Sequence, residues 1–437
     1  MPFAVRGLIL WKGTGQGQGG HEKVWGLGSA RARVSAATNA ASTASRDPVL
    51  ILGGGLMGLA IAHQLARRGT AVQVLSRRRS EAAGFVAAGM LAPHAEGLSG
   101  DLLALGQASL ERIPGWVAQI EADSGLSCGL RPCGIVVPFR STAESDAYPT
   151  AAWGEALERA GLEREIPGIG PEWQAGLLFA QDGQIDNRRR LMRALERACV
   201  GLGVQFQEGG DVLGLERDGV SGALAAVQLR TAEGEEQRLP AQRAVLACGA
   251  WSAQLLPELP VFPVKGQMLS LQGPRRALER VIFGPGTYLV PRQDGLLVVG
   301  ATSEPEAGFS EGLTPAGQRQ LQEGIAALLP AASGWPPMER WWGFRPCTPD
   351  EGPLLGSSPI PGLWLATGHH RNGVLLAAIT AELIAAAVLR EDALRGEVLS
   401  GNGLRECPET TRQGEPFPER PWLQAFRWDR FQQHLSR

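Results

Sequence analysis

Three glycines in a G-x-G-x-x-G pattern, Gly53, Gly55 and Gly58, have the spacing that most directly predicts chemistry, with Gly54 as an extra glycine inside the turn. The first glycine of such a pattern permits a tight turn, the second lets backbone amides approach a pyrophosphate, and the third lets the next helix pack closely. The N-terminus of that helix attracts an anion through its free N–H groups and its dipole. The pattern therefore predicts a dinucleotide-binding site.

Such a motif needs a strand before it and a helix after it. Residues 49–52 (VLIL) are an apolar run short enough for one buried parallel strand. Residues 56–68 predict a helix that Gly69 ends, and residues 71–75 predict the next strand. The flanking residues thus predict the strand–turn–helix–strand unit that positions the motif.

The end of the second strand leaves the dinucleotide open. An acidic residue is usual there, because it binds the ribose hydroxyls. This chain has Ser76 instead, followed by Arg77, Arg78 and Arg79, most of whose side chains we expect to be solvated. An arginine suits the 2′-phosphate of NADP and a serine suits FAD, so both remain candidates at this point.

Later stretches add further candidates. Arg345 lies between Phe344 and Pro346, an apolar context that favours a functional or paired arginine, because an unpaired buried charge is costly. Residues 243–252 (RAVLACGAWS) predict an apolar strand that runs into Gly249, where backbone can approach a cofactor; we interpret Cys248 there as a packed residue and not a redox thiol.

Composition excludes several classes of protein. The 437-residue chain can bury a large core and is long enough for two domains. Its 42 Lys and Arg nearly balance 44 Asp and Glu, so no nucleic-acid partner is expected. Of six cysteines only Cys128 and Cys133 are close in sequence, and nothing completes a zinc set. We expect no metal, and reduced thiols in a cytoplasmic protein.

Residues 1–47 differ from the rest. They are rich in Gly, Ser and Ala, with Glu22 as the only acid before Asp47, and cannot bury enough apolar surface to fold alone. A transit-like targeting segment and a mis-assigned start codon both explain them. The most apolar window, residues 373–389, contains Glu382 and is short for a membrane span. A helix buried inside the fold is expected there, and no membrane partner.

The remaining pattern predicts two kinds of sheet. A helix over 101–122 that Pro114 breaks, a strand over 134–139 and a surface helix over 146–160 are expected, then a helix over 188–200 and a strand over 204–208. An antiparallel meander is expected over 212–217, 225–230 and from 237. Strands at 267–272, 288–291 and 295–300 predict a separate, largely antiparallel sheet, followed by a helix over 315–329 and a strand over 363–366.

The fold class expected is α/β (α+β, two-domain). Residues 48–130, 178–256 and 338–395 are assigned to a discontinuous Rossmann-like dinucleotide domain. Residues 131–177 and 257–337 are assigned to an inserted substrate-binding domain, and residues 396–437 to a C-terminal tail.

An ordered set of motifs resembles the FAD-dependent amine oxidases of the D-amino-acid oxidase superfamily, and within it the glycine oxidases of thiamine biosynthesis. The resemblance covers residues 48 to about 431. It rests on residues 48–79, 87–96 (AAGMLAPHAE), 245–252 (VLACGAWS), 264–267 (VKGQ), 288–292 (YLVPR), 298–302 (VVGAT), 343–350 (GFRPCTPD), 368–376 (GHHRNGVLL) and 422–430 (WLQAFRWDR).

This resemblance implies a Rossmann-like FAD-binding domain with an inserted, largely antiparallel substrate domain, and non-covalent FAD. It implies oxidation of glycine by O2, with sarcosine and small D-amino acids as further candidates, through hydride transfer from Cα to flavin N5. The imine hydrolyses to glyoxylate and ammonia, and H2O2 is the other product. In the thiamine pathway the imine feeds thiazole formation, so thiazole synthase is an expected recipient; a homo-oligomer is a further expectation.

The resemblance also assigns residues. Arg345 would bind the substrate carboxylate, since its guanidinium pairs with both oxygens. Tyr288, one of two tyrosines, would share that carboxylate, and Arg371 would lie near the mouth. A helix starting at Asn372–Val374 would stabilise negative charge on the reduced flavin. The residues expected to hold FAD are Gly53, Gly55, Leu56, Met57, Gly58, Ser76, Ala88, Gly89, Met90, Val212, Gly249, Trp251, Gly343, His370, Arg371, Asn372, Gly373 and Val374.

Two departures and several alternatives accompany the resemblance. Ser76 replaces the usual acid, and the cysteine that attaches flavin in sarcosine-oxidase relatives falls at Gly343, not Cys347. His369 and His370 are weighed as bases, although hydride transfer from a neutral amine needs none; His63 and His94 are expected to be structural. Another amine oxidase or dehydrogenase of the superfamily, an NADP-dependent dehydrogenase and a non-catalytic flavoprotein remain alternatives.

Overall fold

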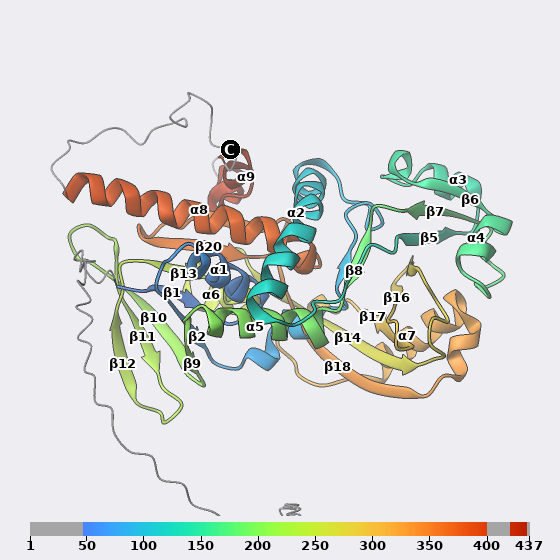
Figure 1. Ribbon diagram of the computed structural model, residues 1–437, viewed down its shortest axis with the longest axis horizontal. Helices are drawn as coiled ribbons and strands as arrows, with labels where there is room; N and C mark the ends of the chain where they lie inside the picture. Colours follow the sequence, from blue (N-terminus) through green and yellow to red (C-terminus); the bar gives the residue numbers. More distant parts are fainter. Residues whose placement is uncertain (1–46, 400–419, 435–437) are drawn as a thin grey trace, which may run out of the picture. The chain divides into compact units, whose positions relative to one another are not determined.

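The structure is a computed structural model that describes residues 47–399 and 420–434 (Figure 1). The N-terminal extension predicted over residues 1–47 therefore lies outside the described residues, except for Asp47. So does much of the predicted C-terminal tail, of which α9 (Arg420–Ala425) and the 3-10 turn after it are described.

A six-stranded sheet follows the predicted strand–turn–helix–strand unit. β1 (Val49–Leu52) pairs in parallel with β2 (Val72–Ser76) on one side and β13 (Ala244–Leu246) on the other. β9 (Gln205–Glu208) and β20 (Leu363–Thr367) extend it in parallel, and β19 (Leu354–Ser357) is an antiparallel edge. β1, β13 and β20 are buried throughout, as expected for parallel strands covered on both faces.

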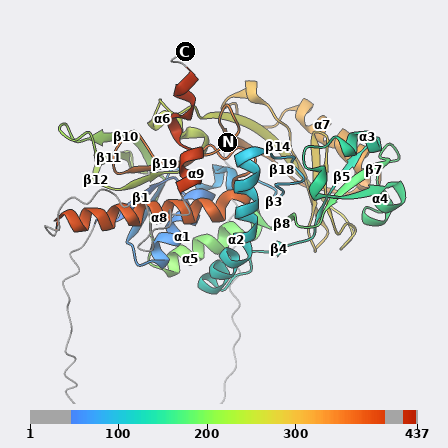
Figure 2. The same ribbon diagram turned by 90° about the horizontal axis from the view of Figure 1, so that it is seen from above.

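Helices cover one face of this sheet and a meander covers the other. α1 (Leu56–Arg67), α2 (Gly100–Ser124), α5 (Met192–Gly201) and α8 (Gly373–Leu399) share one apolar core with the β1 side chains of Val49 and Ile51 (Figure 2). Leu50 and Leu52 point to the opposite face. There they pack with the predicted antiparallel meander of β10 (Asp211–Arg217), β11 (Leu224–Arg230) and β12 (Glu236–Pro240).

Helix α8 is the apolar helix that the sequence predicted. Among the described residues, its Gly373–Glu391 stretch of 19 residues is the one window long and apolar enough to cross a membrane. Within this fold 72% of that window is buried, against α1, α2 and the parallel sheet. A helix that is apolar all round is expected in such an enclosed position.

An eight-stranded sheet holds the second core. Its order is β18 (Pro337–Cys347), β14 (Phe262–Gln272), β17 (Leu296–Gly300), β16 (Thr287–Pro291), β15 (Val281–Gly284), β5 (Ile135–Phe139), β7 (Ala175–Phe179) and β6 (Glu155–Glu158). Its pairings are antiparallel except for β15 with β5. α4 (Arg159–Glu165) and α7 (Pro315–Leu328) pack on one face through Leu162, Leu321 and Ile325.

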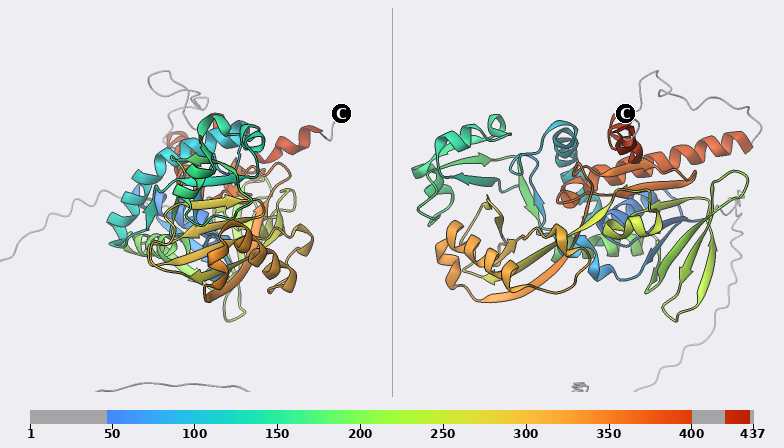
Figure 3. Two further views of the ribbon diagram at one scale, coloured as in Figure 1. Left: turned by 90° about the vertical axis from the view of Figure 1, so that its right-hand side faces the viewer. Right: turned by 180° about the vertical axis from the view of Figure 1, so that it is seen from behind.

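Short elements join the two large sheets. β3 (Met90–Leu91), β8 (Gly183–Ile185) and β4 (Leu130–Arg131) form a small antiparallel sheet. α3 (Thr142–Asp146) precedes β6, and α6 (Ser252–Leu255) follows β13. Figure 3 shows the parallel and the largely antiparallel sheets from two further sides. The predicted fold class is confirmed.

Two predicted elements are wrong. α2 runs without a break through Pro114, because its buried residues, among them Ile113 and Trp116, pack against the other helices, and this packing outweighs the lost backbone hydrogen bond. Residues 146–160 do not form one helix; they contain β6, which pairs with β7 at the edge of the large sheet. Long-range pairing has overridden local propensity there.

The division into domains stays a proposal, with one change. β18 pairs with β14 from Phe262↔Cys347 to Leu271↔Pro337, so it belongs to the eight-stranded sheet. The sequence assigned residues from 338 onward to the dinucleotide domain. We propose instead that β18 belongs to the substrate-binding part.

Candidate active site

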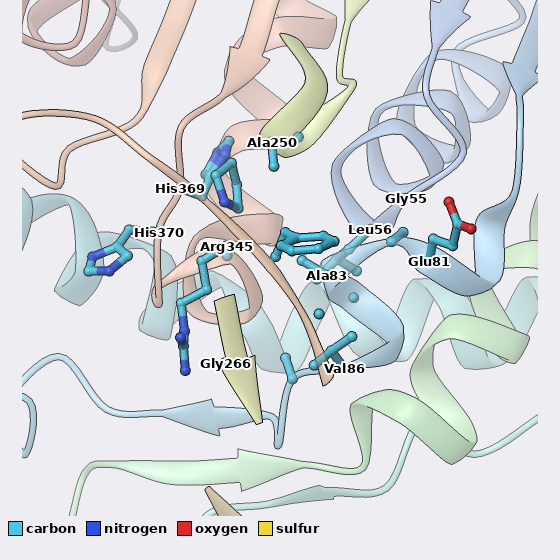
Figure 4. Close-up of a pocket in the computed structure, with 18 of the residues that line it drawn as sticks. Gly55, Leu56, Glu81, Ala83, Val86, Ala250, Gly266, Arg345, His369 and His370 are labelled. Carbon is cyan, nitrogen blue, oxygen red and sulfur yellow. The ribbon is translucent and has the colours of Figure 1, made fainter. Parts of the chain in front are cut away.

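A cavity of about 750 Å³ collects residues from both large sheets. Its nucleotide end is lined by Gly53–Met57, which follow β1, and by Ser76, the last residue of β2. Its substrate end is lined by Tyr288 of β16, Arg345 of β18 and Arg371 of the loop before α8. Figure 4 shows Leu56 and Gly55 on one side of the cavity and Arg345 and His370 on the other. The fold thus brings the sequence-predicted substrate and cofactor residues to one cavity.

The nucleotide end is made of backbone. Gly53 has φ +113°, a conformation that favours glycine, and a Cβ there would lie 2.4 Å from the Ala247 carbonyl oxygen. A Cβ on Gly58 would lie 1.9 Å from the Gly53 carbonyl oxygen, so the helix and the turn touch through this glycine. α1 has no acidic residue in its first turn and no side-chain N-cap. Its N-terminus therefore offers free N–H groups to an anion in the cavity.

The residues after β2 differ from expectation in one respect. Ser76 is buried and lines the cavity. Arg78 is 65% exposed, as predicted for this run, and Arg77 is 40% exposed and lies over the Trp251 ring at 5.5 Å. Arg79 is only 19% exposed and is paired with Glu196 and Glu208. Arg79 is thus the one member of this run that is mostly shielded from solvent, because two acidic neighbours from α5 and β9 pair with it. Most of the run is exposed, as predicted.

Other predicted cofactor residues line the same cavity, with two exceptions. Gly58 is buried behind the turn and Asn372 behind the loop, and neither is part of the cavity wall. The α8 N-terminus faces the cavity through Gly373 and Val374. The remaining members on the wall are Gly53, Gly55, Leu56, Met57, Ser76, Ala88, Gly89, Met90, Val212, Gly249, Trp251, Gly343, His370 and Arg371.

At the substrate end a tyrosine and an arginine lie together. Burial raises the pKa of Tyr288 to about 12, although the charge and a hydrogen bond of Arg345 oppose it. Arg345 donates from Nη1 to the Thr302 carbonyl at 3.0 Å. A Cβ on Gly266, in the neighbouring strand β14, would lie 2.5 Å from that Nη1 (Figure 4). The guanidinium thus occupies the space that the missing side chain of Gly266 leaves free.

The two histidines are poor proton acceptors. Burial lowers the pKa of His369 to about 3, and its Nε2 lies 3.0 Å from Thr380 Oγ1. Burial and the charges of Arg371 and Arg345 lower the pKa of His370 to about 3 as well. Both imidazoles are therefore neutral at pH 7, and neither is suited to act as a catalytic base. The sequence interpretation also favoured a reaction without a histidine base.

Two further histidines and the cysteines have structural surroundings. His63 Nε2 lies 2.8 Å from Asp123 Oδ2, and His94 Nδ1 lies 2.6 Å from Asp182 Oδ1. Cys248 Sγ lies 3.1 Å from the Leu52 carbonyl, and burial raises the pKa of the thiol to about 12. The cysteines of the described ranges are free, and no group of metal-ligand side chains gathers in those ranges. Cys407 lies outside them.

Sequence reasoning missed a buried acid on the cavity wall. The Glu96 side chain is 5% exposed and its Oε2 lies 3.3 Å from Arg371 Nε. Glu351, another missed acid, lines the cavity but is 55% exposed and lies 3.6 Å from His370 Nδ1. Glu96 ends the AAGMLAPHAE stretch, so an acid after a run of small residues was the available signal. No spacing rule marks it.

A glycine-rich turn on a parallel sheet, joined to a largely antiparallel sheet that carries an arginine and a tyrosine, defines a dinucleotide-dependent oxidoreductase. The family model for FAD dependent oxidoreductases (DAO) matches residues 48–387. The chain belongs to this family, and FAD is therefore its cofactor. The uncapped N-terminus of α1 and the N-terminus of α8 line one cavity, which fits that cofactor.

Within this family, the chain is similar to ThiO/ThiG proteins and to glycine oxidases. The chain is 45% identical over 349 residues to the bifunctional protein ThiO/ThiG of Synechocystis sp., which covers 78% of this chain and 51% of the relative. It is 31% identical over 351 residues to the glycine oxidase of Pseudomonas aeruginosa, covering 78% of this chain and 94% of that one. The crystal structure of glycine oxidase from Geobacillus kaustophilus matches with a TM-score of 0.72 at 29% identity, over 78% and 94% of the two chains. The chain spans about half the length of the bifunctional relatives.

Proposed function

We propose that the chain oxidises glycine, with sarcosine and small D-amino acids as further substrates, and that O2 is the oxidant. Glycine, O2 and water would give glyoxylate, ammonia and H2O2. The observation that carries this proposal is the joint position of Arg345, Tyr288 and Arg371 on the wall of the cavity that also holds the N-terminus of α8. The names of the similar glycine oxidases support the choice of substrate.

Each side chain at the substrate end would have its own role. Arg345 and the Tyr288 hydroxyl would bind the substrate carboxylate, which directs Cα toward the interior of the cavity. Tyr288 stays protonated at neutral pH, because its pKa is raised to about 12, and so remains a hydrogen-bond donor. Arg371, 41% exposed, would attract the anionic end of the substrate. FAD, when bound, would take a hydride from Cα and pass the electrons to O2.

The cofactor would be held without a covalent bond. The position at which sarcosine-oxidase relatives carry a cysteine corresponds to Gly343, which lines the cavity. Cys347 is buried and is not part of the cavity wall. We expect acid precipitation of the purified protein to release all of its flavin into the supernatant; flavin that stays with the pellet would contradict this assignment.

Anaerobic reduction tests the proposed reaction. The purified yellow protein is mixed with glycine in the absence of O2, and its visible absorption is followed. We expect the flavin band to bleach and to return on admission of air, with glyoxylate and H2O2 in equal amounts. Bleaching by sarcosine or D-alanine and not by glycine would transfer the proposal to another amine, and no bleaching by any small amine would contradict it.

The product side of the proposal concerns thiazole formation. The ThiO/ThiG names join two functions in one chain in the bifunctional relatives. We infer that a thiazole synthase receives the imine before water hydrolyses it, in the cytoplasm, where the free cysteines of this chain would stay reduced. Addition of such an enzyme to the glycine reaction should lower the yield of glyoxylate per H2O2; an unchanged ratio would contradict the transfer.

A further inference from the structure

Glu96 is a buried acid for which the proposed reaction has so far no role. Its side chain lines the cavity and is 5% exposed. Its Oε2 lies 3.3 Å from Arg371 Nε but has no hydrogen-bond partner among the described residues. A buried carboxylate oxygen without a hydrogen bond is costly, and a native fold usually retains one for a reason. Glu96 is thus a buried acid on the wall of the cavity that a substrate would enter.

The turn that carries Glu96 is fixed on both sides. The Asp182 carboxylate accepts hydrogen bonds from the backbone N–H groups of His94 and Ala95, at 3.2 and 2.8 Å. Thr150 Oγ1 donates to the His94 carbonyl at 2.6 Å. Tyr148 Oη donates to the Ala95 carbonyl at 2.7 Å. The carboxylate therefore does not depend on a mobile loop for its position, which is the preorganisation that a reacting group needs.

Charged groups from several elements act on this carboxylate. Burial raises the pKa of Glu96; Arg371 and Arg345 lower it, and Asp182 and Glu351 raise it further. Tyr148 and Tyr288 also face it, since its charge raises the pKa of each.

Among the other titratable groups of this end, His369 and His370 have pKa values of about 3 and Tyr288 of about 12. None of these exchanges a proton readily near neutral pH.

The substrate poses a matching chemical requirement. A free amino acid is a zwitterion, and its ammonium nitrogen has no lone pair. A hydride can leave Cα only when that lone pair is free to form the C=N bond, so one N–H proton must first be removed. Arg345 and Tyr288 serve the carboxylate, and the cationic end of the same molecule then needs an anionic partner.

We propose that Glu96 binds the ammonium group of the substrate and accepts its proton. The N–H bond breaks and its electron pair stays on nitrogen, while the proton forms an O–H bond on the Glu96 carboxylate. The neutral amine is then bound beside a neutral carboxylic acid, and no oxidant or reductant is consumed in this step. This inference rests on the proposed oxidation of an amino acid, and it adds the group that prepares the amine.

The raised pKa of Glu96 suits this task. A proton acceptor works best when its pKa is near the operating pH, because it is then ionised and still basic enough to hold the proton. Burial favours the neutral form of the Glu96 carboxyl group. Arg371 and Arg345 favour its ionised form. An exposed carboxylate with an ordinary pKa would bind an ammonium group but would rarely take its proton.

Glu96→Gln tests the proposal with two ligands on the FAD-loaded enzyme. Acetate has the carboxylate of glycine but no amine, and its binding is measured by the change that it causes in the flavin absorption. Glycine is followed by anaerobic bleaching of the flavin from pH 6 to 10. At pH 7 we expect the variant to be reduced by glycine about 100-fold more slowly than the parent, in line with the usual contribution of proton transfer. Its affinity for acetate should be unchanged or higher.

The pH dependence of the reduction rate distinguishes a loss of proton transfer from a change in the shape of the site. Without an acceptor, only glycine that has lost its proton in solution can react, so the rate of the variant should rise toward pH 10. We expect the deficit to shrink there to about fivefold or less. A deficit that is constant across this range would overturn the proposal, as would an equal loss of acetate and glycine binding. An unchanged rate would overturn it too.

Two controls accompany these measurements. Glu351→Gln removes another carboxylate of the cavity wall, the one beside His370, and should not slow glycine reduction selectively at low pH. The same pH-dependent deficit there would show a general charge effect and overturn the assignment to Glu96. Acetate binding shows that the Glu96→Gln protein is folded. If the parent enzyme is bleached by no small amine, the proposed oxidation fails; if it is bleached and the variant behaves like it, only the role of Glu96 fails.

Discussion

The two ends of the cavity are built in different ways. The nucleotide end comes from one strand–turn–helix–strand unit, residues 53–57 and Ser76, and consists largely of backbone and glycine. The substrate end comes from separate segments and consists of charged and polar side chains: Glu96, Tyr288, Arg345 and Arg371. A site made of backbone is sensitive to any added Cβ, whereas a site made of side chains is sensitive to the loss of a functional group.

The largest effect should come from a Cβ at the nucleotide end. In Gly58→Ala the added carbon would lie 1.9 Å from the Gly53 carbonyl oxygen, so α1 must move away from its turn. We expect FAD affinity to fall by 10- to 100-fold or more, on the order of 1–3 kcal/mol for overpacking. The flavin content of the purified protein measures it.

Gly115→Ala is the matched control for that change. Gly115 lies inside α2 with nothing within 4 Å of its added Cβ. We expect full flavin content and, because alanine favours the helix, a gain in stability of about 0.5–1 kcal/mol. Equal flavin content in Gly58→Ala and Gly115→Ala would contradict the account of the nucleotide end.

An effect of similar size, at the other end of the cavity, should come from Arg345→Met. Loss of a charged hydrogen-bonding partner costs about 2–3 kcal/mol, so the KM for glycine and the Kd for acetate should both rise by roughly 30- to 150-fold. FAD should stay bound, since Arg345 belongs to the other end. Arg340→Met changes an exposed arginine of the same strand and should leave both constants within about twofold. Loss of FAD in the Arg345→Met variant would contradict the assignment of Arg345 to the substrate end alone.

Gly266→Ala adds a Cβ at the substrate end, so its effect can be compared with that of the added Cβ in Gly58→Ala. The added carbon would meet the Arg345 guanidinium at 2.5 Å, which is the end of a flexible side chain. The guanidinium can move, so we expect a roughly tenfold rise in the KM for glycine, about 1.4 kcal/mol, with FAD retained. In the Arg345→Met background the same change should have almost no further effect, because the two residues act through one contact. Additive losses would contradict this coupling.

The last effect, absent at neutral pH, concerns the tyrosines, both of which lie near Glu96. Burial raises the pKa of Tyr148 and of Tyr288 to about 12, above the value of about 10 in an unfolded chain. Above pH 10 the unfolded state loses these protons first, so the stability of the fold should decrease between pH 10 and 12, by up to about 2–3 kcal/mol per tyrosine. Phenolate absorption near 295 nm should show almost no ionisation at pH 10 in the folded protein and half ionisation after unfolding. Half ionisation at pH 10 in the folded state would contradict the burial of both hydroxyls.

Features that depend on neighbours in sequence were predictable. The strand, turn and helix around Gly53–Gly58 follow from an apolar run, a glycine spacing and a terminating Gly69, all within about one supersecondary unit. The meander and α7 are likewise marked by local alternation, turns and helical period. The choice of FAD over NADP depended on the later motifs and on the family, because Ser76 and the arginines after it suit either cofactor.

Tertiary structure decided the features that depend on distant partners. Pro114 stays inside α2 because the buried face of α2 packs against other helices. Arg79 is partly buried because Glu196 and Glu208 pair with it from α5 and β9. Glu96 faces Arg371 across 275 residues of sequence. Sequence by itself determined the glycine turn of the nucleotide end, because the strand, the turn and the helix that form it are neighbours in the chain. The charge, burial and proton affinity of the substrate end were decided by the fold, since they arise only when separate segments meet and exclude water.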